Sequence, residues 1–475
     1  MNKNSPARVL SLLLAVLMLF LPLRPSWGGM FDSLTIDKER EIGEEFFLEL
    51  QQVIPVVEDP FIASYFNRLG QKLVSQLEAQ PFKYRFFVVN DPSMNAFAVP
   101  GGYIFVTTGM IRMMEREGEL AGVLAHEISH VYARHMFKTM EKAKVANVAS
   151  ILGALASIAL AGVGGAALAQ ALMATSMAGG TSAMLAYSRD FEKEADALGF
   201  KWMVKAGYDP RDMMSIFKKM NRQRWFEGGK IPIYLSTHPD IDGRLVDLGH
   251  QLSQYGQPRP SAGNNPEFQY FAIRVEATSG NAHQLLRRMT QDSLREPQDP
   301  AFHYGKALAL ANLERGDEAL AEFQQALKLT PGNYLIQRDL AIYYFQRNRY
   351  MDASKILEDL SRQHPQDEAV LYYLGRICQE RRQYDQALAL FEKVHKLNPA
   401  FIEVYYNLGT VYGEKKQLGP AHYYLAFHSL KTKALPVALF HFRKALSNLN
   451  SSDPRYPEVK RQIARLEKMK VRVRN

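Results

Sequence analysis

The feature that most restricts the fold is a repeat of 34 residues in the C-terminal part of the chain. Small residues, large apolar residues and prolines recur at this interval: Ala319, Ala353, Ala387 and Ala421; Phe323, Leu357, Phe391 and Leu425; Pro331, Pro365 and Pro399. A small residue lets two antiparallel helices approach closely, and a proline ends a helix. The spacing therefore predicts an all-α stack of helix pairs over residues 298–475.

The period and its residues resemble the tetratricopeptide repeat. The resemblance implies a solenoid whose concave face holds a protein partner or substrate. The register weakens after Pro399, since Lys433 stands where the next proline is expected and residues 435–446 are predicted to form an extra helix. Cys378 is the one cysteine and falls at a core position of the repeat, which excludes an intrachain disulfide and a cysteine-rich metal site.

The first 28 residues have the pattern of an export signal. Lys3 and Arg8 precede a thirteen-residue apolar stretch, 9–21, and small residues at 26 and 28 suit cleavage. This stretch is shorter than the roughly 20 residues that a membrane-spanning helix needs. We therefore expect a cleaved signal peptide over residues 1–28 and a periplasmic protein, soluble or peripherally attached to the membrane. The net charge of +9 is too small for this length to indicate nucleic-acid binding.

Residues 29–255 are predicted to form an α+β domain that is mainly helical. Helical patterns surround two short β-rich segments, 82–89 and 103–107, and a long helix is expected over 119–140. A stretch rich in Pro, Gly and Asn then opens residues 256–297, which we assign to a linker and the helices that lead into the repeats.

Metal chemistry is indicated by an H-E-I-S-H run at 126–130. Residues four apart share a helix face, so both imidazoles can hold one metal ion while Glu127 reaches a water beside it. A catalytic zinc site has three protein ligands and one open position. The third ligand is expected further along, where Glu192 and Asp196 share a helix face and Glu194 points elsewhere. Spacing alone leaves open which of Glu192 and Asp196 binds the metal and which holds a histidine N–H.

His135 follows His126 by nine residues. On a continuous helix this spacing places the two side chains on opposite faces. We therefore expect His135 to be structural and not a ligand.

The segment 145–186 is uncharged, rich in Ala and Gly, and long enough to cross a bilayer. Its two ends must nevertheless return to one metal. A buried helical hairpin or a mobile lid over the active site is therefore favoured over a membrane-touching segment.

The H-E-x-x-H run, followed by S-R-x-x-E-x-E-A-D at 188–196, resembles the gluzincin metallopeptidases, which include the CAAX prenyl protease, the heat-shock protease HtpX and the mitochondrial protease Oma. The resemblance implies a zincin-type peptidase domain with one Zn²⁺ per chain. It assigns the zinc ligands to His126, His130 and Glu192. It also implies that Glu127 is the catalytic base and that Asp196 supports a ligand.

The same family carries a His-Pro pair followed by an Arg, found here at His238 and Arg244. The resemblance implies that His238 can fill the fourth zinc position and hold the enzyme shut. It also suggests Arg244 as a catalytic residue that steadies the tetrahedral intermediate. The segment 103–107 would either hold a peptide along an exposed strand edge or be an ordinary core strand.

An export signal together with tetratricopeptide repeats is similar to the periplasmic members of this family. That similarity implies an endopeptidase of outer-membrane protein assembly and quality control, with a chaperone-like contribution. The expected substrates are unfolded or misassembled proteins, and the expected partner is the barrel-assembly machinery of the outer membrane, bound through the repeats. Three alternatives stay open: a chaperone or adaptor with a latent peptidase, an integral-membrane protease, and a zinc-binding scaffold without hydrolysis.

Overall fold

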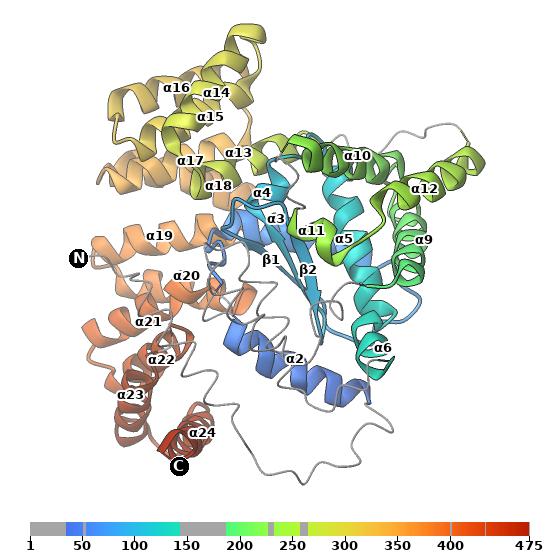
Figure 1. The fold of residues 1–475 in the computed structure, drawn as a ribbon. Helices are drawn as coiled ribbons and strands as arrows, with labels where there is room; N and C mark the ends of the chain where they lie inside the picture. Colours follow the sequence, from blue (N-terminus) through green and yellow to red (C-terminus); the bar gives the residue numbers. More distant parts are fainter. Residues whose placement is uncertain are drawn as a thin grey trace. The chain divides into compact units, whose positions relative to one another are not determined.

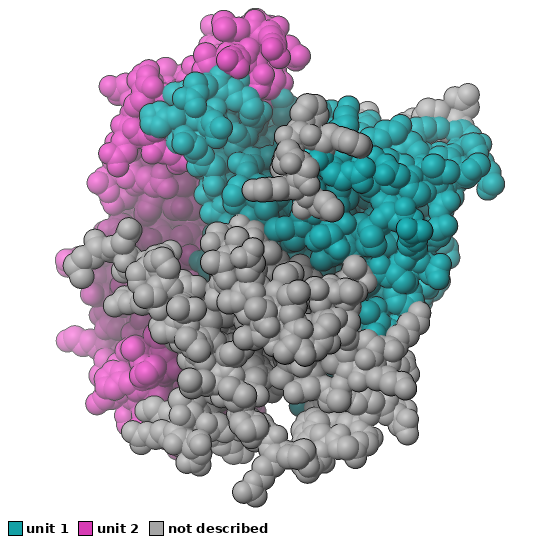
Figure 2. Space-filling model, in the orientation of Figure 1, with its two compact units in different colours: residues 1–289 teal, residues 290–475 magenta. Residues whose placement is uncertain are grey.

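The computed structural model describes residues 35–50, 54–142, 187–226, 232–256, 265–399, 401–432 and 434–474. The chain divides into two compact units, residues 1–289 and 290–475 (Figure 2). The expected signal peptide, 1–28, and the uncharged segment, 145–186, lie outside the described residues. Across the part of the chain that is described, no helix has the length and apolar character needed to span a membrane.

The first unit is mainly helical. Its helices are α2 (Ile36–Leu50), α3 (Pro60–Val74), α4 (Thr108–Ile111), α5 (Glu117–Tyr132), α6 (His135–Lys142), α9 (Arg189–Lys205), α10 (Arg211–Phe226), α11 (Ile233–Thr237), α12 (Ile241–Tyr255) and α13 (Glu267–Ser279). The division between the units falls within α14 (Ala282–Arg295). The predicted α+β, mainly helical class is confirmed.

A three-stranded sheet lies among these helices, in the order β1 (Arg85–Val89), β3 (Tyr103–Thr107), β2 (Ala96–Val99). β3 pairs in parallel with β1 and antiparallel with β2. The interpretation of 103–107 as an exposed edge is therefore wrong, because β3 has a neighbour on both sides and all its residues are buried. The alternative, an ordinary core strand, is confirmed.

β2 was not predicted from the sequence. The chain reverses between β2 and β3 through Gly101 and Gly102, whose φ angles of 82° and 95° suit glycine alone. This tight turn brings a four-residue segment back against β3.

α5 is the central helix of the unit and packs against β2, α3, α9 and α10 (Figure 1). Its first turn is held by buried acids. Glu117 accepts hydrogen bonds from the hydroxyls of Tyr65 and Tyr208, and Glu119 accepts from Lys219 Nζ at 2.9 Å. Every residue from Glu117 to Val131 is buried, so side chains on all faces of α5 are fixed by packing.

The helix expected over 119–140 is interrupted. α5 ends at Tyr132, Arg134 has a left-handed φ of 56°, and α6 begins at His135. This conformation costs a non-glycine residue about 1–2 kcal/mol. The Nε of Arg134 donates to Oε2 of the buried Glu39 at 2.6 Å, which holds the break in place. The prediction of one continuous helix was wrong because a contact with the distant α2 overrides local helix propensity.

The second unit consists of antiparallel helix pairs. They are α15 (Pro300–Asn312) with α16 (Gly316–Leu329), α17 (Tyr334–Gln346) with α18 (Tyr350–Gln363), α19 (Glu368–Glu380) with α20 (Tyr384–Leu397), and α21 (Ile402–Glu414) with α22 (Leu418–Lys431). Two further helices follow, α23 (Leu435–Asn448) and α24 (Tyr456–Arg474). The predicted all-α repeats and the extra helix are confirmed.

The repeat positions explain the packing of these pairs. The four alanines are buried in the second helix of each pair, at Ala319, Ala353, Ala387 and Ala421. The turn inside each pair also contains a left-handed residue at the same interval of 34: Glu314, Asn348, Arg382 and Lys416, with φ of 58–59°. No single residue type marks this turn position, so the periodicity of composition did not reveal it.

Candidate metal centre

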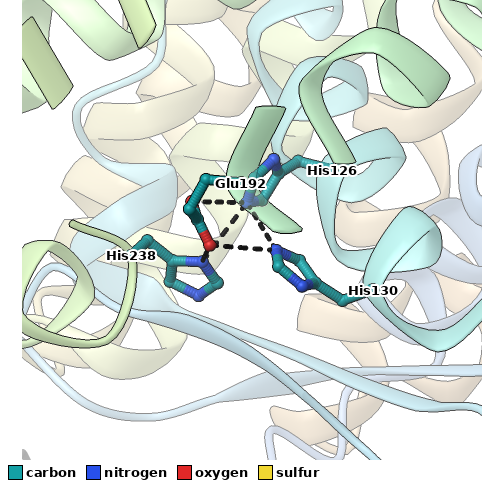
Figure 3. Close-up of side chains that lie close together, drawn as sticks. All are labelled: His126, His130, Glu192 and His238. Atoms are coloured by element: carbon teal, nitrogen blue, oxygen red, sulfur yellow. Dashed lines mark hydrogen bonds and ion pairs between the residues drawn. The ribbon is translucent and has the colours of Figure 1, made fainter. Parts of the chain in front are cut away.

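Three elements bring the four candidate ligands together. α5 provides His126 and His130 one turn apart, the first turn of α9 provides Glu192, and His238 directly follows α11 (Figure 3). α9 begins where the Oγ of Ser188 accepts a hydrogen bond from the N–H of Phe191, which sets the direction in which Glu192 points. All four ligand candidates are buried, and one ligand atom of each lies within 4.8 Å of the others.

The distances in this cluster suit one ion. The two Nε2 atoms of His126 and His130 are 3.0 Å apart. The carboxylate oxygens of Glu192 lie 3.3 Å from Nε2 of His130 and 3.5 Å from Nε2 of His126. Two ligand atoms bound 2.0–2.2 Å from a tetrahedral ion are about 3.3–3.6 Å apart. The two imidazole–carboxylate distances lie in this range and the distance between the imidazoles is slightly below it, so the three side chains converge as the ligands of a single small cation would.

His238 lies on the remaining side of the cluster. Its Nδ1 is 3.1 Å from Oε1 of Glu192 and 3.2 Å from Nε2 of His126. The ring of Tyr234 stacks on it at 4.4 Å. The structure thus brings His238 into contact with two of the three other ligand candidates.

Glu127 has a different environment. Both of its carboxylate oxygens are buried without a hydrogen-bond partner among the described residues, and Oε1 lies 3.6 Å from Nε2 of His238. Burial raises the pKa of this carboxyl. Buried polar groups are nearly always hydrogen-bonded, so an exception beside this cluster of candidate ligands indicates a group that meets a ligand or water.

Asp196 and Glu192 take separate positions, although they share a face of α9. Oδ1 of Asp196 is 2.8 Å from Nδ1 of His126, on the side of the ring away from the cluster. Glu192 faces the two Nε2 atoms instead.

Arg244 connects the two acids and is almost fully buried, with 1% of its surface exposed. Its Nε and Nη2 each donate to Asp196 at 2.7 Å, and Nη1 lies 2.8 Å from Oε2 of Glu192. Burial alone would raise the pKa of both carboxyls, but the charge of Arg244 is the main cause that instead lowers them. Both acids are thereby held as carboxylates.

Burial and the charge of Arg244 oppose protonation of His126. Glu192 and Asp196 outweigh them and raise the pKa of His126 to about 9. Two carboxylates therefore favour positive charge around this ring, one at Nδ1 and one facing Nε2.

Two further contacts were not foreseen. Tyr187 stacks on His130 at 3.9 Å, and His135 lies with its Nδ1 3.0 Å from Nδ1 of His130. Tyr187 has no sequence signal because it belongs to no motif. His135 was expected on the opposite helix face, and the break at Arg134 is what brings it to His130.

Comparison with known proteins matches different families to the N-terminal and C-terminal parts of the chain. Residues 62–251 match Peptidase family M48, and residues 280–334, 313–377 and 375–416 match tetratricopeptide repeats. The first match contains all the candidate site residues.

Several curated proteins are similar over a longer span. The chain is 32% identical over 337 residues to the beta-barrel assembly-enhancing protease of Escherichia coli K12, which covers 69% of this chain and 68% of that protein. It is 31% identical over 306 residues to the protein of that name from Yersinia pestis, covering 63% and 62%. The mitochondrial metalloendopeptidase OMA1 of Schizosaccharomyces pombe is 28% identical over 229 residues, covering 47% and 64%.

Proposed function

Because the chain belongs to peptidase family M48, together with the beta-barrel assembly-enhancing proteases, we propose that it is a zinc endopeptidase that degrades misassembled outer-membrane proteins in the periplasm. Metallopeptidase activity follows from the family. The single observation that supports the assignment to this site is the buried convergence of His126, His130 and Glu192 beside Glu127, whose carboxylate has no hydrogen-bond partner among the described residues.

His126, His130 and Glu192 are the proposed zinc ligands. Two imidazoles and one carboxylate are a ligand set used by catalytic zinc, whereas magnesium and calcium prefer oxygen ligands alone. Zinc at such a site supplies Lewis acidity, which polarises a carbonyl group and lowers the pKa of water to about 7. Asp196 accepts the Nδ1 proton of His126 and so leaves Nε2 of that ring free to bind.

Glu127 is the proposed general base. It takes a proton from the attacking water and gives it to the nitrogen of the departing amine, so that the peptide C–N bond breaks and the carboxylate is regenerated. Its raised pKa supports this role, because a base closer to neutral pH can both accept and return the proton.

His238 is the proposed fourth ligand, which closes the centre to substrate. Its contacts with Glu192 and His126 support this role, as does its burial. Opening then requires His238 and the residues around it to move away from the cluster.

Arg244 is proposed to hold Asp196 and Glu192 in their positions, which its contacts with both acids support. The role at the tetrahedral intermediate remains a prediction from the family resemblance. Stability, zinc affinity and kcat of Arg244 variants distinguish the two roles.

The tetratricopeptide repeats are proposed to bind unfolded or misassembled substrates and the barrel-assembly machinery of the outer membrane. Helical repeats present extended surfaces for proteins. The names of the similar proteases support a role in barrel assembly. An export signal over 1–28 is part of the proposal.

The decisive test is cleavage of an unfolded outer-membrane β-barrel protein by the purified mature chain. We expect cleavage to stop when a chelator removes the metal. Glu127→Gln is expected to keep one zinc per chain while cleavage falls by about 10²–10⁴-fold. A Glu127→Gln variant that cleaves at the wild-type rate would refute the catalytic assignment.

A second candidate is an adaptor or chaperone whose peptidase is latent. The position of His238 in the cluster favours it, because a filled centre cannot take substrate. Full genetic complementation by Glu127→Gln would support this alternative.

A further inference from the structure

We propose that His135 and Glu194 form a hydrogen-bonded pair that positions His130 and selects the tautomer with which His130 meets the metal. The proposal rests on the metal centre proposed above and extends it to residues outside the ligand set. His135 and Glu194 act through His130 and do not touch the ion themselves.

The contacts run in one line from the surface to the centre. Oε2 of Glu194 lies 3.1 Å from Nε2 of His135, and Nδ1 of His135 lies 3.0 Å from Nδ1 of His130. The other nitrogen of His130, Nε2, faces His126 and Glu192. His135 is completely buried, whereas the side chain of Glu194 is 46% exposed.

The hydrogen-bonding groups determine where each proton lies. A carboxylate only accepts, so Nε2 of His135 carries the proton in its bond to Glu194. In neutral His135, Nδ1 is then an acceptor and requires a proton on Nδ1 of His130. Neutral His130 is left with its lone pair on Nε2, at the atom that faces the other ligands. The opposite tautomer would point an N–H at the metal position.

Stacking against other aromatic rings holds the imidazoles of His135 and His130. Phe191 lies parallel to His135, with ring centroids 4.4 Å apart and an interplanar angle of 11°. Tyr187 stacks on His130 at 23°. Lys138 lies 3.9 Å from the same oxygen of Glu194, at the exposed end. Neither imidazole can rotate without losing a ring contact as well as a hydrogen bond.

The break between α5 and α6 makes the contact between the two imidazoles. On a continuous helix, residues five apart lie about 140° from each other around the axis. The left-handed Arg134, held by Glu39, turns the chain so that His135 meets the rear of His130. Strain of this kind persists where the surrounding structure stabilises it, and it is often found at functional sites.

The centre thus supports its two histidines by different means. Asp196 holds Nδ1 of His126 directly, as carboxylates commonly do behind zinc-binding histidines. His130 instead contacts the imidazole of His135, and it is His135 that contacts a carboxylate, that of Glu194. Removing the nearer partner of a metal-binding histidine typically weakens metal binding by about 10–100-fold.

Three variants test the proposal. His135→Phe keeps an aromatic ring against Phe191 but removes the acceptor, and we expect zinc affinity, measured by competition with a chelator, to fall about 10–100-fold. His135→Asn can place an oxygen near the position of Nδ1 and is expected to recover most of the affinity. Glu194→Ala alters only a half-exposed side chain, so the chain should fold, with zinc affinity lowered about 3–10-fold.

Lys138→Ala is the matched control, because it changes the charge beside Glu194 and leaves the two hydrogen bonds in place. The visible absorption spectrum of the cobalt-substituted chain is a second measurement, expected to change in His135→Phe and to return in His135→Asn. If the role of His135 were purely structural, His135→Phe and His135→Asn would lower the thermal stability of the metal-free chain equally. Zinc affinity and the cobalt spectrum would then not recover in His135→Asn.

Wild-type zinc affinity in both His135→Phe and Glu194→Ala would overturn the inference and leave the proposed function intact. A wild-type chain that binds no zinc at all would instead overturn the proposed function and this inference together. Affinity lost in His135→Phe and recovered in His135→Asn supports the inference.

Discussion

Nη1 of Arg244 lies 2.8 Å from Oε2 of Glu192, and both side chains are buried beside the candidate metal ligands. The same guanidinium binds Asp196 through two hydrogen bonds of 2.7 Å. One cation therefore balances two carboxylates, one of which faces the centre while the other supports His126.

Arg244→Met should destabilise the metal-free chain, because it leaves two buried carboxylates without their cation, and breaking such pairs costs about 3–5 kcal/mol. A lower midpoint of thermal unfolding and weaker zinc binding are expected. Arg244→Lys keeps the charge but not the forked geometry of the guanidinium. Its stability and zinc affinity should therefore lie between those of the wild type and of Arg244→Met. A Met variant with normal stability and zinc affinity but a lower kcat would instead support the predicted role at the intermediate.

His238→Ala should raise basal cleavage of an unfolded protein several-fold, because it removes the side chain proposed to close the centre. The measurement is the initial rate at saturating substrate with equal zinc content in both proteins. His250→Ala, at an exposed position of α12, is the control and should cleave at the wild-type rate. Unchanged cleavage by a folded, zinc-loaded His238→Ala chain would argue against gating.

Glu39 should make stability depend on pH. Burial raises its pKa to about 7, although Arg134 acts in the opposite direction. Because this value lies above the ordinary value of 4.5, the folded chain binds more protons than the unfolded chain between about pH 4.5 and 7. The contribution of Glu39 to stability is therefore present at low pH and is lost as the pH rises through this window.

Glu39→Gln removes that titration. The thermal unfolding midpoints of the wild type and of Glu39→Gln should be compared from pH 5 to 7.5. As the pH rises, the midpoint of the variant should increase relative to that of the wild type. A constant difference at every pH would contradict the assignment. Glu39→Gln also loses the ion pair with Arg134, which shifts its unfolding midpoint by a constant amount. The test therefore uses only the change with pH of the difference between the two midpoints.

The repeats offer a matched pair of glycines. A Cβ added at Gly375 in α19 would lie 2.6 Å from the ring of Phe391, whereas a Cβ at Gly413 in α21 meets nothing within 4 Å among the described residues. Gly375→Ala should therefore destabilise the repeats by about 1–3 kcal/mol through overpacking. Gly413→Ala should stabilise them by about 0.4–1 kcal/mol. Urea unfolding followed by helix content distinguishes the two, and equal effects would contradict the packing described here.

Most of the correct predictions about the fold and the candidate site came from two sequence patterns. The interval of 34 residues indicated the helix pairs, because every pair buries its alanine at the same position of the second helix. The H-E-x-x-H spacing indicated that His126 and His130 share a helix face. Both patterns are local, so a helix geometry of 3.6 residues per turn is enough to interpret them.

The remaining features depend on contacts between distant segments. Arg134 adopts a left-handed conformation that its residue type does not suggest, and Glu39 from α2 stabilises it. The position of His135 against His130 follows from that break and from no spacing rule. The separate positions of Glu192 and Asp196 likewise depend on Arg244, which comes from α12.

His126, His130 and Glu192 are proposed to hold one zinc ion together. The most direct measurement is the zinc content of the purified mature chain, compared with that of Glu192→Gln after both are equilibrated with the same limiting free zinc. We expect one zinc per chain in the wild type and a large loss in the variant. Equal zinc content in the two proteins, or none in the wild type, would contradict it.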